Sequence, residues 1–196
     1  MSSELISIEQ ATYIADQLWL TDEDSNPPII YAVLDGARDK RIHEIVKNSG
    51  LRHSCLYDGK LTYELTVAAP YLIRLEKDQP FVIELIQQAW GNSWGIFILT
   101  HAPTTLVSVR RNCKKLAFVK DEQNKKLLFR YYDPRVLRTF LPSCRESELK
   151  QIFGPVASYA MEDDTASAMH FFNQKESGFK QRKKSLPDFS AASMRA

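Results

Sequence analysis

Three side chains in the first third of the sequence have chemistry that an active site needs. Asp35 ends a short apolar run, and α/β enzymes place acidic groups at this kind of strand end. His53 and Cys55 would share one face of a short strand, which suggests a thiol with an imidazole neighbour. Residues two apart on a strand are about 7 Å apart, however, and an Asp followed by Gly36 is ordinary turn chemistry. The favoured interpretation of all three side chains is therefore structural.

Residues 126–132 and the segment that follows them hold the most distinctive combination of side chains. Their alternation predicts an interior strand that is covered on both faces. Arg130 would then need a buried acid such as Asp35 or Asp133, unless it clamps an anionic ligand. Asp133 is suited to cap a helix whose first residue is Pro134. Of the two interpretations of Arg130, we favour the core ion pair.

The sequence predicts neither a metal ion nor another cofactor. The four histidines are His43, His53, His101 and His170, and their spacing matches no metal-binding motif. Gly36 lacks the further glycines and the lysine that phosphate-binding loops use. We therefore expect neither a metalloenzyme nor a nucleotide-binding protein.

Composition is typical of a globular protein of the cytoplasm. The chain has 196 residues, 44% of them hydrophobic, and a formal net charge of +2 that is too mild to predict nucleic-acid binding. Cys55, Cys113 and Cys144 are odd in number and far apart, so a disulfide framework is not expected. The longest apolar run is too short to cross a bilayer, and the N-terminus lacks the pattern of a signal peptide. These features favour a cytoplasmic protein without membrane insertion.

Hydrophobic periodicity predicts strands that alternate with helices. Ser7 and Gln10 form a capping box at the start of the first helix, and the segment Trp94–Thr100 gives the strongest strand signal. An adjacent strand pair near Leu116 and Leu127 implies an antiparallel part. The predicted fold class is therefore α/β (mixed), with helices packed on a mixed sheet.

The C-terminal region divides into three predicted parts. We expect a main domain over residues 1–161, a small helical part over 162–174, and a mobile basic tail over 175–196, where periodicity is lost. The tail and the basic face at 110–115 raise the alternative of a nucleic-acid-binding protein. The tail is short and lacks interleaved aromatic residues, which favours a solvated segment.

Six sequence motifs occur in a characteristic order between residues 29 and 161. Together they resemble the adaptor proteins of type VI secretion systems, a family first catalogued only as a domain of unknown function. The most distinctive of them is FRYYDPRVL. The motifs are YAVLDGA at 31–37, APYLIRL at 69–75, the segment 94–100, the basic helix after Pro103, FRYYDPRVL at 129–137, and Phe-Gly-Pro at 153–155.

The resemblance implies a non-catalytic adaptor or chaperone rather than an enzyme. Such a protein binds a cognate toxic effector in the cytoplasm and helps to load it onto a trimeric, VgrG-type spike protein. The positions that recur in the family are interpreted here as structural, so that no catalytic residue is assigned. They are Asp35, Pro70, Leu72, Trp94, Gly95, Arg130, Tyr132, Asp133 and Pro134.

If those positions build the core, the partners must bind elsewhere. Three exposed segments are the candidates: the linker Thr21 to Pro28, the region Asp58 to Thr66, and the helices expected after Pro155. One alternative is a small cytosolic hydrolase or transferase that uses Asp35, or the pair of His53 and Cys55. The other is the nucleic-acid binder.

Overall fold

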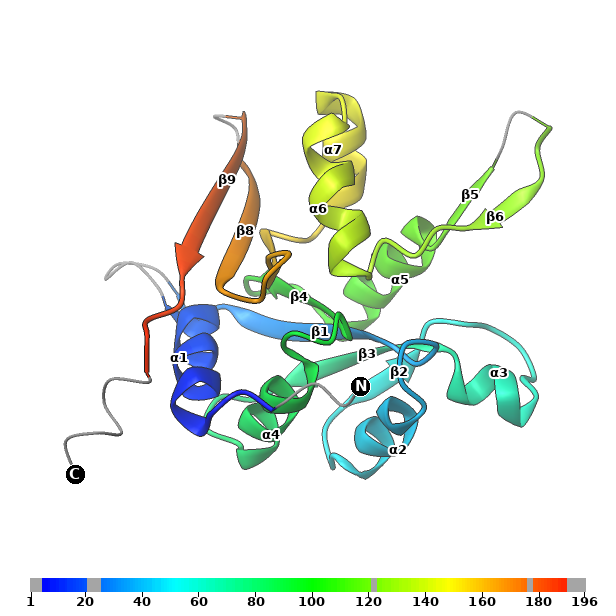
Figure 1. Cartoon of the computed structure of the whole chain (residues 1–196). Coiled ribbons are helices and arrows are strands. Elements are labelled where there is room, and N and C mark those ends of the chain that lie inside the picture. The colour runs from blue at the N-terminus through cyan, green and yellow to red at the C-terminus, as the bar shows by residue number, and fades with distance from the viewer. Residues whose placement is uncertain (1–4, 21–25, 121–122, 176–177, 190–196) are drawn as a thin grey trace.

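The computed structural model describes residues 5–20, 26–120, 123–175 and 178–189. These residues build a seven-stranded sheet in the order β2-β3-β1-β4-β7-β8-β9, in which every strand pair is antiparallel (Figure 1). The prediction of a mixed α/β fold is thus confirmed, whereas the expected parallel component of the sheet is wrong. The strands are β1 (Ile29–Asp35), β2 (His53–Cys55), β3 (Pro70–Leu75), β4 (Gly95–Thr100), β7 (Ser158–Glu162), β8 (Ala168–Lys175) and β9 (Gly178–Ser185).

Seven helices within the described residues surround the sheet. In Figure 1, α1, α2 and α4 lie below the strands, and α5, α6 and α7 lie above them. None of the helices in this part of the chain is long and apolar enough to cross a membrane. The helices are α1 (Ile8–Trp19), α2 (Arg41–Asn48), α3 (Tyr63–Val67), α4 (Pro80–Ala89), α5 (Leu106–Leu116), α6 (Pro134–Ser143) and α7 (Glu146–Phe153).

The sheet separates two hydrophobic cores, and β1 contributes to both. Ile30, Ala32 and Leu34 pack into the core between the sheet and α1, α2 and α4. Tyr31 and Val33 pack into the second core, with residues of α5, α6 and α7. Because side chains alternate along a strand, a strand covered on both faces is apolar almost throughout. The short apolar run that ends at Asp35 has this pattern because β1 is buried on both faces.

The capping box predicted at the N-terminus is confirmed. The Ser7 hydroxyl accepts a hydrogen bond from the Gln10 backbone N–H at 3.2 Å, and the Gln10 side chain accepts one from the Ser7 N–H at 3.0 Å. Both bonds satisfy amides that would otherwise lack partners in the first turn. α1 therefore begins at the residue that this local signal predicts.

The predicted interior strand at 126–132 is wrong. Only Lys126–Leu128 are extended, as β6, and they pair with β5 (Phe118–Lys120) in a separate two-stranded hairpin. This hairpin projects away from the body of the molecule (Figure 1). The chain leaves β6 at Phe129 and enters the second core through a turn, where Tyr131 and Tyr132 are buried. Apolar alternation thus arises from an exposed arm followed by a buried turn.

The predictions for the C-terminal region are also wrong. Residues 162–174 do not form a helix: β7 ends at Glu162, a turn follows, and β8 runs from Ala168 to Lys175. Residues 178–185 of the expected mobile tail form β9, which pairs with β8 along its whole length. Residues 190–196 lie outside the described part of the chain. The main sheet therefore includes segments that the sequence assigned to an appendage and a tail.

Candidate functional site

Two of the motif residues, Asp35 and Arg130, form an ion pair. Asp35 is the last residue of β1, and it is only 1% exposed. The Arg130 Nε donates a hydrogen bond to its Oδ2 at 3.0 Å, and Arg130 Nη2 contacts the same oxygen. The Ala37 N–H donates to the other carboxylate oxygen at 3.1 Å. Hydrogen bonding to Asp35 raises the pKa of Arg130, so the guanidinium stays charged.

Pro70, Trp94 and Gly95 hold the end of β1 from both sides. The Asp35 N–H donates to the Trp94 carbonyl at 2.7 Å, and Asp35 lies opposite Pro70 in the register of β3. A Cβ atom on Gly95 would lie 2.0 Å from the Val33 carbonyl oxygen, so any larger residue would push β4 away from β1. Backbone packing alone thus gives these motif positions a structural function.

Leu72 and Tyr132 belong to the second core beside this ion pair. Leu72 lies opposite Val33 in the register of β3 and β1, and both side chains are fully buried. Tyr132 is also buried, with its ring 5.4 Å from that of Tyr131 in an edge-to-face arrangement. Burial raises the pKa of the Tyr132 hydroxyl, which therefore stays protonated. A phenol in this state is a packing group and not a nucleophile.

Asp133 caps α6, as its position before Pro134 predicted. Its Oδ1 accepts from the Arg135 N–H at 3.0 Å, and the Arg135 guanidinium binds both carboxylate oxygens at 2.9 and 2.5 Å. Burial opposes ionisation of Asp133, but the hydrogen bonds from Arg135 outweigh it and lower its pKa. Of the two acids considered as partners for Arg130, the structure therefore joins Asp35 to it and commits Asp133 to the helix end.

The thiol and imidazole proposed as an alternative site are not joined by a hydrogen bond in the described structure. The Nδ1 of His53 lies 2.9 Å from the Leu51 carbonyl oxygen, beside its own backbone. Burial raises the pKa of Cys55, which opposes thiolate formation. Arg110 donates to the Cys55 carbonyl, so its contact to this residue is with the backbone. This geometry does not activate the thiol.

The basic face of α5 is partly neutralised. Arg110 and Lys114 both form ion pairs with Asp58, at 3.4 Å for the arginine. Hydrogen bonding and attraction to these cations lower the pKa of Asp58. Among the residues that the structure describes, no group of three His, Cys, Asp or Glu side chains could hold a metal ion.

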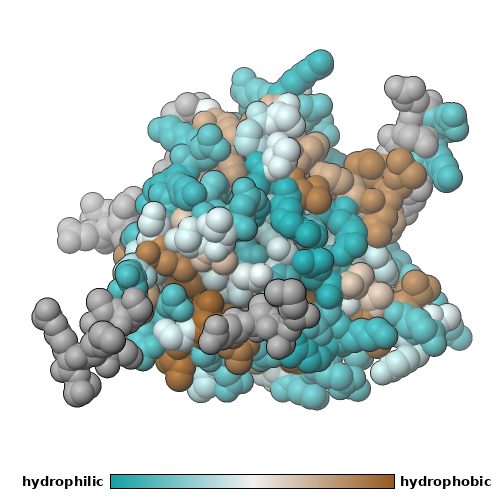
Figure 2. Space-filling view, viewed as in Figure 1, coloured by the Kyte–Doolittle hydropathy of each residue, from teal (hydrophilic) through white to brown (hydrophobic). Residues whose placement is uncertain are grey.

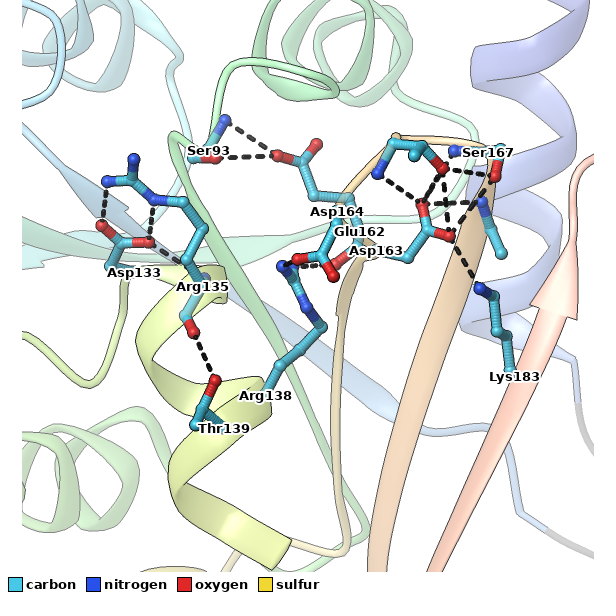
Figure 3. A network of polar contacts seen from close by, with 12 residues as sticks. Ser93, Asp133, Arg135, Arg138, Thr139, Glu162, Asp163, Asp164, Ser167 and Lys183 are labelled. Atoms are coloured by element: carbon cyan, nitrogen blue, oxygen red, sulfur yellow. Dashed lines mark hydrogen bonds and ion pairs between the residues drawn. The ribbon is translucent and has the colours of Figure 1, made fainter.

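A second polar network, which sequence reasoning missed, lies where β7 meets the loop after α4 (Figure 3). The buried Glu162 carboxylate accepts from the Gly91 N–H, from the Ser93 N–H at 2.8 Å and from the Ser93 hydroxyl at 3.2 Å. Arg138 of α6 donates to the Glu162 carbonyl at 2.6 Å. The available signal is the acidic run at 162–164, which falls at the start of the helical part predicted over residues 162–174.

The adjacent residues Glu162 and Asp163 have opposite pKa shifts. Burial raises the pKa of Glu162, and its hydrogen bonds only partly offset this effect. Burial also opposes ionisation of Asp163, but Lys183 at 2.9 Å and the N–H groups of Ser167 and Ala168 lower its pKa to about 2. This carboxylate organises the turn between β7 and β8 and ties β9 to it.

Exposed apolar side chains gather on the β5–β6 hairpin. Val119 and Leu127 lie directly opposite each other in the register and are 43% and 41% exposed, and Leu128 is exposed as well. Figure 2 shows hydrophobic atoms over this arm, above the more polar body. An isolated two-stranded hairpin is marginally stable in water, and this one also presents apolar side chains to solvent. It is therefore a candidate surface for a protein partner.

The structure describes the three segments predicted to bind partners to different extents. Residues 58–66 lead into α3, on which Tyr63 is 72% exposed, beside a pocket of about 420 Å³ that is lined by α2 and α3. In the predicted linker Thr21 to Pro28, residues 21–25 lie outside the described part of the chain. The helices expected after Pro155 are strands. Of the three segments, only the second is described in full and exposes a large apolar side chain.

Comparison with known proteins identifies the family. A family model described as "Domain of unknown function (DUF4123)" matches residues 30–151, which extend from β1 to α7 and include every motif position from Asp35 to Pro134. No curated protein and no solved structure matches the chain. The match covers more than half of the sequence, and the chain therefore belongs to the DUF4123 family.

Proposed function

We propose that this protein is a non-catalytic adaptor of a type VI secretion system. It binds a cognate effector in the cytoplasm and helps to load it onto a VgrG-type spike protein. The ordered motifs that resemble these adaptors support the proposal, and most of them lie within the residues matched by the family model.

The observation that carries the proposal is how the reactive motif residues are used. Asp35 and Arg130 neutralise each other at the end of β1, and Asp133 caps α6. A catalytic carboxylate needs a free oxygen within reach of a substrate. Asp35 is only 1% exposed, and both of its oxygens accept hydrogen bonds from the protein. These side chains stabilise the core, and we therefore expect partners to bind the surface around it.

We place the effector contact on the β5–β6 hairpin. The cross-strand pair of Val119 and Leu127 presents apolar surface on an arm that stands clear of the body. An effector segment with exposed apolar side chains would bury both surfaces on binding, and burial favours association by about 25 cal/mol per Å² before the entropy of association is subtracted. Binding to the arm would cover apolar surface of the effector that would otherwise promote aggregation, which suits a chaperone.

Co-expression with the effector and spike proteins that neighbouring genes encode tests the proposal. We expect the wild-type chain to co-purify with the effector, and the double variant Val119→Glu/Leu127→Glu to lose at least about tenfold in affinity, because two carboxylates would be buried without partners. Ile8→Glu is the matched control: Ile8 is 62% exposed on α1, on the opposite side of the molecule. An acidic residue also suits this first turn.

Two results would contradict the proposal at different levels. If the wild-type chain binds neither the effector nor the spike protein, the adaptor function is wrong. If it binds the effector, and both variants bind equally well, the function stands and the hairpin is not the contact surface. Circular dichroism of each variant controls for folding.

A further inference from the structure

The two edges of the main sheet differ in length and exposure. β2 ends one side and has three residues, whereas β9 ends the other and has eight. Short edge strands limit unwanted pairing, but a long exposed edge offers a row of backbone donors and acceptors to another chain. Along β9, residues 180–183 and Ser185 are exposed. β9 lies outside the residues that the family model matches, so the family does not explain it.

Backbone pairing shows which groups of β9 face outward. The Leu186 N–H donates to the Ser167 carbonyl at 2.8 Å, continuing the register in which Ser185 lies opposite Ala168. Directions alternate along an antiparallel strand, so the even-numbered residues of β9 bond to β8 and the odd-numbered ones point away. No other described residue bonds to those outward backbone groups. They belong to Phe179, Gln181, Lys183 and Ser185.

The same edge is strongly basic. β9 contains Lys180, Arg182, Lys183 and Lys184 and no acidic residue. Of these four cations, only Lys183 forms an ion pair with a described acidic residue, which is Asp163. The guanidinium of Arg182 lies over the Phe171 ring at 4.7 Å, and Lys184 contacts the neutral Gln17 side chain and lies 5.7 Å from the Tyr13 ring centre. These contacts position the cations without neutralising them.

We propose that β9 binds an acidic, extended segment of a protein partner as an eighth strand of the sheet. The outward amides and carbonyls would form the backbone ladder, and the cations would select an acidic strand and repel basic ones. Lysines on an edge also prevent pairing with unrelated strands, and an acidic segment is the class that escapes this protection. The inference is independent of the secretion role, because the partner is defined by its charge and conformation alone.

The edge suits a peptide better than a nucleic acid. Proteins that bind single-stranded nucleic acids combine cations with exposed aromatic rings on which bases stack. The one aromatic residue of β9 is Phe179, and its ring packs on Phe153 and Phe172. Free backbone groups, by contrast, are what strand addition requires.

The test uses the full chain and a synthetic probe. The probe is a fluorescent eight-residue peptide of alternating Glu and Thr with blocked ends, measured by fluorescence anisotropy at low salt. Two comparison peptides keep the length: one replaces Glu by Lys, and the other has every backbone nitrogen methylated, which retains the charges but removes the amide donors. Site-resolved hydrogen exchange then follows the outward amides of β9.

The expected result combines charge and backbone dependence. The acidic peptide binds and slows exchange at Phe179, Gln181, Lys183 and Ser185, while the basic and methylated peptides bind at least about tenfold more weakly. Lys180→Glu/Arg182→Glu weakens binding of the acidic peptide by about tenfold. The matched control Lys47→Glu/Lys60→Glu changes two exposed lysines near α2 and α3 and leaves binding unchanged.

Four results would overturn the inference. They are no binding of the acidic peptide at low salt, equal binding of the methylated peptide, equal loss in both double variants, and tighter binding of an eight-nucleotide single-stranded DNA. The second would indicate charge attraction alone, and the fourth would favour nucleic acid. The methylated peptide needs only the wild-type chain, so the test remains decisive if a variant fails to fold.

Discussion

The Arg130 guanidinium binds the Asp35 carboxylate across 95 residues of sequence. The Asp35 side chain is 1% exposed and the Arg130 side chain is 40% exposed, so the arginine lies between the buried carboxylate and the solvent. The pair joins the end of β1, an interior strand of the sheet, to the turn that leads into α6. It thereby connects two of the motifs on which the family resemblance rests.

Removing Arg130 is expected to destabilise the fold. Arg130→Gln leaves the Asp35 carboxylate buried beside a neutral group, and breaking such a pair costs about 3 kcal/mol or more when both partners are buried. Because Arg130 is partly solvated, we expect about 2 kcal/mol, measured by urea unfolding. Arg135→Gln is the control, since its side chain is 53% exposed and should cost about 1 kcal/mol or less. Equal losses in the two variants would contradict a special role for the pair.

Replacing Asp133 separates capping from charge. Asp133→Ala removes the acceptor for the Arg135 N–H at the start of α6 and is expected to cost about 1 kcal/mol. Asp133→Asn retains an oxygen that can cap the helix, so it should cost less at neutral pH. Thermal unfolding measures both, and an alanine variant as stable as wild type would show that the cap contributes nothing.

Local signals predicted local structure well, because the residues that form it are neighbours. Ser7 with Gln10, and Asp133 with Pro134, contain the whole geometry of a helix start within four residues. Burial and pairing depend on residues far away, and there the same reasoning failed. The alternating segment 126–132 was equally compatible with an interior strand and with an arm that turns into the core.

The C-terminal strands illustrate the same limit. Met169 and Phe171 pack into one core and Phe172 into the other, so the apolar residues of β8 lack the alternation of a half-buried strand. β9 has an exposed, basic sequence, and only its pairing with β8 makes it a strand. For the site, the sequence indicated that Arg130 needs a buried acid but could not choose between Asp35 and Asp133.

Asp163 is expected to make stability depend on acid pH. Its pKa is lowered to about 2 in the folded protein, against about 3.9 in an unfolded chain, so its contribution is complete above about pH 5 and is lost progressively as the pH falls through about 2. This amounts to between about 2 and 3 kcal/mol. Urea unfolding between pH 2 and 7 should show that Asp163→Asn lacks this part of the acid dependence. The exposed Glu84→Gln is the control, and an Asn variant with the wild-type profile would contradict the assignment.

Glu162 is expected to behave in the opposite sense. Because its folded pKa is raised, its contribution to stability is present below the usual carboxyl range and is lost as the pH rises through the raised value. Glu162→Gln keeps an oxygen acceptor for the Gly91 and Ser93 amides, so we expect it to be at least as stable as wild type at pH 7. Glu162→Ala leaves those amides without an acceptor and should cost about 2 kcal/mol. A glutamine variant as unstable as the alanine variant would show that the charge itself is needed.

Thiol labelling tests the catalytic alternative. Cys113 is buried and its pKa is raised to about 12, and burial also raises the pKa values of Cys55 and Cys144. We expect iodoacetamide to label no cysteine of the native protein at pH 7 faster than a free thiol, and Cys113 only after unfolding. Mass spectrometry identifies the labelled residues. Rapid labelling of Cys55 that depends on His53 would restore the case for a nucleophile.

Secretion of the effector tests the central claim most directly. In a strain that lacks this protein, we expect effector export to fall to background, and to recover with the wild-type chain or with Ile8→Glu, but not with Val119→Glu/Leu127→Glu. Export of an unrelated substrate of the same apparatus should not change. Normal secretion of the effector in the strain without the protein would contradict the claim that this chain is its adaptor.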